Sequence, residues 1–348
     1  MGAESEPSFR WSPLTVSPEA TPRLDGVVET VRHPEFAGMT FLHVRARTLL
    51  NAVPAASRMP FRWTANLYRG CSHACGYCFA RPSHTWLELD PDEGFDTTIV
   101  VKINAVERLR AELRANRTRG EAVALGTNTD PYQRCEGRYR LTRGVLETFV
   151  AAHHPFSLLT KGTLVTRDAD VLAAATRDGI CRGVALSIGT ADAEVARLTE
   201  SGAPRPDARL AAVAALTDAG VDTGVMLAPI IPGLSDSDAQ LTATVRAALD
   251  AGATSVRPIV LHLRPGVREI FLRRLGTSRP DVADCLAAMY TSAVAPREVR
   301  RRISARVREI VAECGGPRPS SLPAPTRGNP PPPRAGGDEQ PGEQLSLC

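Results

Sequence analysis

The chain has 348 residues, of which 43% are hydrophobic and 23% are charged. This composition is typical of a soluble globular protein with one large domain or two small ones. No apolar run approaches the length of about 18 residues that a membrane span needs, and the first residues lack the basic and then apolar order of a signal peptide. These features favour a cytoplasmic protein. The net charge of +4 is too small to indicate a polyanionic partner by itself.

Taken in chain order, residues 1–37 are predicted to be poorly ordered, and residues 38–51 to form a strand and a helix over the mouth of the core. A strand predicted at residues 63–68 leads into a group of cysteines. From residue 121 onward, short β-like runs alternate with longer helical ones, the pattern of β/α units around a parallel sheet. The further strands are expected at 122–126, 156–160, 183–188, 222–229 and 255–261, and the helices at 104–116, 142–152, 168–176, 207–219 and 236–250.

The C-terminal part of the chain is expected to differ from this α/β core. Residues 268–314 place apolar side chains at helical spacing, which predicts a helical C-terminal extension packed against the core. Residues 315–348 are rich in proline and glycine and include the run Pro330–Pro333. Such a composition buries too little apolar surface to order itself, so a disordered tail is predicted.

Three cysteines, Cys71, Cys75 and Cys78, lie within eight residues. Zinc would need a closed set of four Cys or His ligands, usually as two separated pairs, and disulfides would leave one thiol unpaired. Soft thiolates suit the irons of an iron-sulfur cluster, which normally has four such ligands. The C-x3-C-x2-C spacing therefore favours a cluster held by three thiolates, with one iron open to another ligand.

This spacing, with Tyr77 before the last cysteine, resembles the signature of the radical S-adenosylmethionine (SAM) superfamily. Within the superfamily the chain resembles the spore photolyase-like branch, and more closely an uncharacterised family of that branch from GC-rich bacteria. The resemblance spans roughly residues 40–265 and is carried by the runs at 60–64, 68–81, 126–133, 159–162, 187–190 and 229–234.

The resemblance implies a partial (β/α)6 TIM-like barrel of the radical SAM type over residues 38–267. It also implies a 4Fe-4S cluster on Cys71, Cys75 and Cys78, and reductive cleavage of bound SAM to a 5′-deoxyadenosyl radical. The loops after the strands build the active site of such a barrel. The enzyme would be a lyase or would abstract hydrogen from a substrate, and it would need a reducing partner such as flavodoxin or ferredoxin.

Residues at the predicted strand ends are candidates for binding SAM, which carries an ammonium, a carboxylate, a ribose and an adenine. Thr127, Thr129 and Asp130 offer acceptors where the superfamily usually meets the ammonium group, although an Asp-Pro turn with capping hydroxyls explains them equally well. Lys161 suits a carboxylate, or is a solvated loop lysine. The remaining candidates are Ser187 and Arg209 for the carboxylate or ribose, and Tyr77 and the apolar turn around Ala228 for the adenine.

The resemblance does not extend to the hydrogen-donating residue. Spore photolyase has a cysteine at the end of its second barrel strand, and Thr127 takes that position here. A threonine hydroxyl is a far poorer hydrogen-atom donor than a thiol, which argues against the spore repair mechanism. Cys135, eight residues further along, is a catalytic candidate or an incidental loop thiol, and no other catalytic residue is predicted.

The last five residues, 344–348, resemble the short peptide with which bacterial repair proteins bind the sliding clamp, except that cysteine replaces the final phenylalanine. This resemblance makes nucleic acid a possible substrate class. Two other functions stay open: a radical SAM enzyme that modifies a peptide, an RNA or a metabolite, and a non-catalytic iron-sulfur protein that binds nucleic acid or senses redox state.

Overall fold

The computed structural model describes residues 26–54, 57 and 59–317. Two sheets organise this part of the chain, one of seven strands in the order β11-β10-β9-β8-β7-β4-β3 and one of four in the order β1-β2-β6-β5. The strands are β1 (Val27–Val31), β2 (Thr40–Val44), β3 (Leu50–Ala52), β4 (Trp63–Ala65), β5 (Tyr68–Arg69), β6 (Thr98–Lys102), β7 (Val123–Leu125), β8 (Phe156–Thr160), β9 (Cys181–Ser187), β10 (Thr223–Ile230) and β11 (Val256–Val260).

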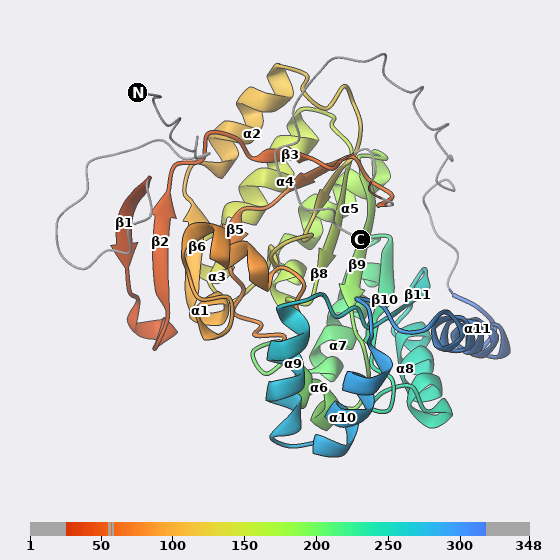
Figure 1. The fold of residues 1–348 in the computed structure, drawn as a ribbon. Coiled ribbons are helices and arrows are strands. Elements are labelled where there is room, and N and C mark those ends of the chain that lie inside the picture. Colours follow the sequence, from red (N-terminus) through yellow and green to blue (C-terminus); the bar gives the residue numbers. More distant parts are fainter. Residues whose placement is uncertain (1–25, 55–56, 58, 318–348) are drawn as a thin grey trace, which may run out of the picture.

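Helices connect and cover the strands of the large sheet (Figure 1). They are α1 (Glu93–Thr97), α2 (Ala105–Arg114), α3 (Glu136–Tyr139), α4 (Leu141–Ala151), α5 (Ala169–Arg177), α6 (Ala193–Thr199), α7 (Pro206–Asp218), α8 (Asp238–Asp250), α9 (Val267–Gly276), α10 (Pro280–Met289) and α11 (Arg297–Glu313). Short 3-10 helices occupy Pro34–Phe36, Arg81–Leu87 and Thr163–Asp168. None of the described helices is long and apolar enough to cross a membrane.

The six strands β4 and β7–β11 run parallel to their neighbours, and the antiparallel strand β3 pairs with β4 at one edge. This confirms the predicted α/β core and its partial (β/α)6 barrel. The strands supply nearly continuous apolar residues because helices cover them: Val123, Ala124 and Leu125 of β7 are all buried. The carboxyl ends of all six strands consequently meet at one end of the barrel, where the site is built.

The small sheet was not predicted. Residues 38–51 form the strand β2 and the start of β3 rather than a strand and a helix, and β1 lies within the segment predicted to be poorly ordered. β2 pairs in parallel with β6, far along the chain, and antiparallel with β1. The predicted disordered tail, apart from residues 315–317, and the clamp-binding peptide at 344–348 lie outside the described residues, as do residues 1–25.

Three helices, α9, α10 and α11, occupy the predicted C-terminal extension. α11 buries Ile303, Val307 and Ile310 and packs against α8 and β11, on the opposite side of the molecule from the small sheet (Figure 1). α9 instead reaches the cysteine-containing loop. The extension thus completes the core at one place and contacts the candidate site at another.

Candidate cluster and cofactor site

The three predicted ligands lie on a single loop, residues 70–78, which follows β5 and is here named the cysteine loop. Cys71 and Cys75 are buried and Cys78 is partly exposed, and all three are free thiols. Tight turns shape the loop: the amide of Ala74 donates to the Cys71 carbonyl at 3.2 Å, and that of Cys78 to the Cys75 carbonyl at 3.2 Å. The fold therefore holds the three thiols in one short, ordered segment.

Burial makes these thiols hard to ionise when no metal is bound. It raises the pKa of Cys71 well above the ordinary value, and raises that of Cys75 to about 12 with a further contribution from the nearby Glu200 carboxylate. The pKa of Cys78 is raised by the same cause. Thiolates in such surroundings need soft cations to compensate their charge.

The donor set fits an iron-sulfur cluster. Among the described residues, no group of three or more His, Cys, Asp and Glu side chains is arranged around a single metal ion. A cluster makes a different demand, because each thiolate binds a different iron. Three thiols spaced along one loop, with no fourth cysteine in it, match a cluster that keeps one iron open.

The loop after β7 forms hydrogen bonds to the cysteine loop. The Thr129 hydroxyl donates to the Gly70 carbonyl at 2.7 Å. The side-chain amide of Gln133 donates to the same carbonyl at 3.2 Å and accepts from the Ser72 amide at 3.0 Å. Thr129, predicted to contact SAM, is thus hydrogen-bonded to the cysteine loop, and Gln133 is a member of the site that the sequence analysis did not identify.

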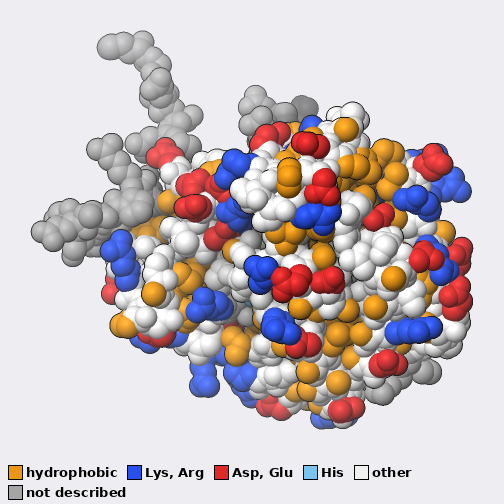
Figure 2. Space-filling view, turned by 90° about the horizontal axis from the view of Figure 1, so that it is seen from below, with side chains coloured by type: hydrophobic (Ala, Val, Ile, Leu, Met, Phe, Trp, Pro, Cys, Tyr) orange, Lys and Arg blue, Asp and Glu red, His pale blue; other side chains and the backbone are white. Residues whose placement is uncertain are grey.

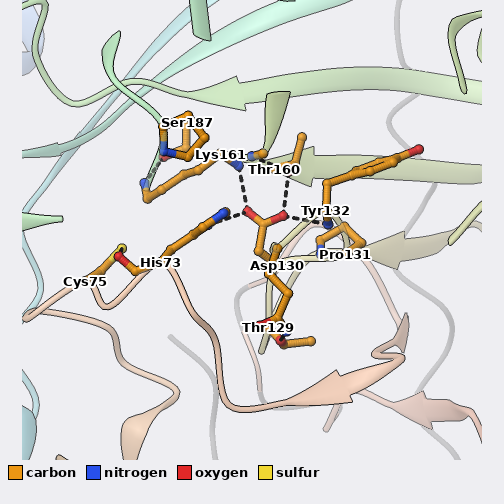
Figure 3. Close-up of polar contacts among 12 residues, drawn as sticks. His73, Cys75, Thr129, Asp130, Pro131, Tyr132, Thr160, Lys161 and Ser187 are labelled. Atoms are coloured by element: carbon orange, nitrogen blue, oxygen red, sulfur yellow. Dashed lines mark hydrogen bonds and ion pairs between the residues drawn. The ribbon is translucent and has the colours of Figure 1, made fainter. Parts of the chain in front are cut away.

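Asp130 connects the cysteine loop to the end of β8 (Figure 3). One carboxylate oxygen accepts from the Thr160 hydroxyl at 2.6 Å and the Tyr132 amide at 2.8 Å. The other accepts from the Lys161 amide at 2.6 Å and lies 3.3 Å from the His73 Nδ1. Burial alone would raise the pKa of Asp130, but His73 and these hydrogen bonds lower it to about 2. Both oxygens are therefore engaged within the protein.

Three of the other predicted residues, Ser187, Ala228 and Tyr77, surround the Lys161 ammonium. It donates to the Ser187 hydroxyl at 2.6 Å and to the Ala228 carbonyl at 3.4 Å, and lies 5.9 Å from the centre of the Tyr77 ring. Lys161 follows β8, Ser187 ends β9, Ala228 lies in β10, and Tyr77 belongs to the cysteine loop. The parallel strands and the cysteine loop thus bring these groups to one point.

Arg209 belongs to the same group through Glu200, which the sequence analysis did not identify. The Arg209 guanidinium is 1% exposed, donates to the Ser187 carbonyl at 2.9 Å and pairs with Glu200. The Glu200 carboxylate also pairs with Lys161 at 3.3 Å and accepts from the Tyr77 hydroxyl. Burial opposes its charge, yet Lys161 and Arg209 lower the pKa of Glu200 to about 2. A buried anion thus joins two cations beside Cys75.

The backbone around Glu200 is joined to the cysteine loop. Glu200 and Cys75 form an antiparallel β-bridge, and the Gly202 amide donates to the His73 carbonyl at 3.1 Å. A Cβ atom at Gly202 would lie 2.1 Å from the Ser72 carbonyl oxygen, so only glycine allows this approach. No sequence motif marks a lone glutamate at a helix end, so this contact could be found only from the fold.

Thr127 and Cys135 lie apart from the Lys161 group. Thr127 is half-buried at the end of β7 and donates to the Asn66 side chain at 3.4 Å. Cys135 is fully buried in the main hydrophobic core, and burial raises the pKa of its thiol well above the ordinary range. Its thiol would have to leave the core to meet a substrate.

The three-thiol loop at the mouth of a partial barrel is the arrangement of an iron-sulfur enzyme built on a β/α scaffold. The chain belongs to the radical SAM superfamily: the family model described as "Radical SAM superfamily" matches residues 65–245. Members of this superfamily use a 4Fe-4S cluster together with SAM, which agrees with the donor set above.

Two relatives of this chain carry names that state no activity. An uncharacterized protein of Mycobacterium tuberculosis, Rv2578c, is 42% identical over 315 residues, which cover 88% of this chain and 92% of that protein. The uncharacterized protein MJ0683 of Methanocaldococcus jannaschii is 27% identical over 175 residues, 50% of this chain and 62% of its own length.

Among solved structures, the chain is similar to spore photoproduct lyase complexed with dinucleoside spore photoproduct. The TM-score is 0.60 at 16% sequence identity, and the match covers 78% of this chain and 79% of the lyase. This likeness shows that the chain shares its fold with the lyase.

Proposed function

We propose that Cys71, Cys75 and Cys78 hold the 4Fe-4S cluster and that the groups around Lys161 bind SAM beside it. When bound, the cluster and SAM supply a 5′-deoxyadenosyl radical, which removes a hydrogen atom from a substrate. The observation that carries this proposal is the meeting of Lys161, Ser187, Ala228 and Glu200, with the backbone of Glu200 paired to that of Cys75.

The chemistry of this group complements SAM. The cations of Lys161 and Arg209 suit a carboxylate. The Glu200 carboxylate and the Ala228 carbonyl are acceptors that suit an ammonium or ribose hydroxyls, and the Tyr77 ring offers an apolar face. SAM would exchange for some of the protein's own ion pairs when it enters.

The loop after β7 has a different part in this proposal. Thr129 and Asp130 act on the cofactor through the cysteine loop, since their side chains are bonded to Gly70 and His73. Thr127 stays a predicted contact for SAM. We propose flavodoxin or ferredoxin as the one-electron donor and the cytoplasm, where thiols stay reduced, as the compartment.

The test is release of 5′-deoxyadenosine from protein reconstituted with iron and sulfide under anaerobic conditions, reduced, and given SAM. We expect release by the wild type and none by Cys78→Ala. Cys285→Ala is the matched control, because Cys285 is an exposed cysteine on α10, and it should release as much as the wild type. A cluster without SAM cleavage in the wild type would refute the proposal and indicate a non-catalytic iron-sulfur protein.

For the substrate we propose nucleic acid, on account of two exposed aromatic side chains close after Cys78 in the chain. Phe79 is 40% exposed and Trp86 is 48% exposed. The Arg264 guanidinium lies 5.9 Å from the centre of the Phe79 ring, and that of Arg69 lies 5.7 Å from the Trp86 ring. Aromatic faces stack on bases and arginines contact phosphates, a combination typical of single-strand binding.

Overall charge contributes little to this proposal. Figure 2 shows Lys and Arg side chains interspersed with Asp and Glu over the face seen from below, with hydrophobic side chains between them. Because the net charge is only +4, binding would depend mainly on the aromatic–arginine pairs.

Binding of single-stranded and duplex DNA at low and high salt tests the substrate class. Phe79→Ala and Trp86→Ala should each weaken single-strand binding by about ten-fold, the scale of one lost stacking contact. Ile103→Ala is the control, since Ile103 is 37% exposed but aliphatic. No binding by the wild type at low salt would refute nucleic acid and favour a peptide or a metabolite.

A further inference from the structure

Arg81 is completely buried and points at the backbone of a predicted cluster ligand. Its guanidinium donates to the Cys75 carbonyl from Nε at 3.0 Å and from Nη2 at 2.8 Å. It also donates to the Asp92 carbonyl at 2.6 Å. A planar, always charged group with several donors is suited to fix a backbone carbonyl in one place.

Two aspartates connect Arg81 to the helix α9. Asp96 pairs with Arg81 at 2.7 Å and with Arg274 of α9 at 2.9 Å. Arg274 also donates from Nε to the Asp92 carboxylate at 2.9 Å, and the exposed Arg273 pairs with Asp92. An alternating row of charges thus runs from α9 to the Cys75 carbonyl.

α9 contacts the two residues after Cys75 as well. The Phe271 ring meets the Tyr77 ring edge-on, with ring centres 6.0 Å apart. A Cβ atom at Gly76 would lie 3.2 Å from the Phe271 side chain. The predicted C-terminal extension therefore contacts residues 75–77 of the cysteine loop. An extension that served only to pack the core would not need these contacts.

We propose that Arg81 is a positioning residue for the cluster and that Asp96 and Arg274 hold it in place. Arg81 fixes the Cys75 carbonyl, and thereby the direction of the Cys75 thiol. Its charge beside the ligand favours the reduced, more negative cluster, whereas the Asp96 charge disfavours it. This inference rests on the proposed function in one respect, namely that Cys75 binds the cluster.

The test is the midpoint potential of the reconstituted cluster, followed by electron paramagnetic resonance in a redox titration, together with iron and sulfide content per chain. Arg81→Gln should lower the midpoint potential and Asp96→Asn should raise it. Arg273→Gln is the matched control, because Arg273 pairs with Asp92 but its side chain is 62% exposed, so solvent screens its charge. It should leave the potential unchanged.

Arg81→Lys separates charge from geometry. Lysine keeps the positive charge but lacks the planar fork, so its cluster should have a potential closer to the wild type than that of Arg81→Gln. Hydrogen exchange in the cluster-free protein gives a second readout: the amides of residues 75–78 should exchange faster in Arg81→Lys than in the wild type, while strand amides stay protected. If Arg81→Gln does not fold, Arg81→Lys and Asp96→Asn carry the test.

Opposite shifts of the midpoint potential in Arg81→Gln and Asp96→Asn would show that these charges act on the cluster. A purely structural defect would not shift the potential in a direction set by the sign of the charge removed. Shifts of the same sign, or unmoved potentials at full iron content, would overturn the inference. Failure of the wild type to hold a cluster would instead refute the proposed function, so the two failures are distinguishable.

Discussion

Replacement of Glu200 by glutamine tests the electrostatic account of the site. Glu200 is 5% exposed and Arg209 is 1% exposed, and the Lys161 side chain is 13% exposed. The substitution keeps the shape of the side chain but leaves the two cations facing one another without their anion. Loss of one partner of a buried ion pair typically costs about 3–5 kcal/mol. A native domain has only about 5–15 kcal/mol of stability in total, so the effect should be large.

The assay is urea unfolding of the cluster-free protein at pH 7 under reducing conditions, followed by circular dichroism. Glu194→Gln is the matched control: Glu194 pairs with Arg197 at 2.7 Å, but the two side chains are 78% and 73% exposed, and such pairs contribute less than about 1 kcal/mol. A loss below about 1 kcal/mol in Glu200→Gln, or an equal loss in both variants, would refute the reasoning. Lys161→Met combined with Glu200→Gln should restore part of the loss, because one uncompensated cation is then gone.

Three further substitutions test the contacts of the cysteine loop. Gly202→Ala should lower both stability and iron content, because its Cβ would lie 2.1 Å from the Ser72 carbonyl oxygen. Gly137→Ala on the helix α3 is the control, because its Cβ would meet the Leu164 side chain at 3.8 Å, an ordinary van der Waals contact, and it should be neutral or stabilising by about 0.5–1 kcal/mol. Equal iron loading in both variants would contradict this. The pKa of Asp130 is lowered from 3.8 to about 2. Its ionised form therefore contributes about 2 kcal/mol to the free energy of unfolding above pH 3.8, and this contribution is lost as the pH falls toward 2. Asp130→Asn should therefore flatten the acid side of the stability curve in urea titrations between pH 5 and pH 2, and an unchanged slope would show that the contacts of the Asp130 carboxylate do not lower its pKa. Lys161→Met should weaken SAM binding by about ten- to a hundred-fold in calorimetry of the reconstituted protein, the scale of one lost charge-assisted hydrogen bond, and unaltered affinity would remove Lys161 from the SAM site.

The barrel could be predicted because its signals are local. Each β/α unit carries its own alternation of short apolar and longer helical runs, and the strand predicted at 156–160 has the same bounds as β8. The small sheet could not be predicted in this way. β2 finds its parallel partner β6 more than fifty residues later, and β5 has only two residues, so no local pattern states that these segments pair.

The site residues also differ in whether a local sequence signal marks them. Cys71, Cys75 and Cys78 could be predicted as ligands from their spacing. Lys161 and Ser187 could be predicted as site residues because parallel strands end at one edge of the sheet. Glu200 follows from neither rule. It ends a helix between β9 and β10, and its role exists only because the fold brings it against Cys75.

Asp130 shows why a polar residue at a strand end is an ambiguous signal. The same carboxylate could face a ligand or a neighbouring loop, and the sequence is identical in both cases. In the structure Asp130 holds His73 on one side of the cysteine loop, while Glu200 engages Tyr77 on the other. Two buried carboxylates thus contact His73 and Tyr77, which alternate with the three cysteines along the loop. Each carboxylate is also paired with donors that the barrel supplies, Asp130 with the Lys161 amide and Glu200 with Arg209. These contacts join the cysteine loop to the barrel through residues that are not themselves predicted cluster ligands.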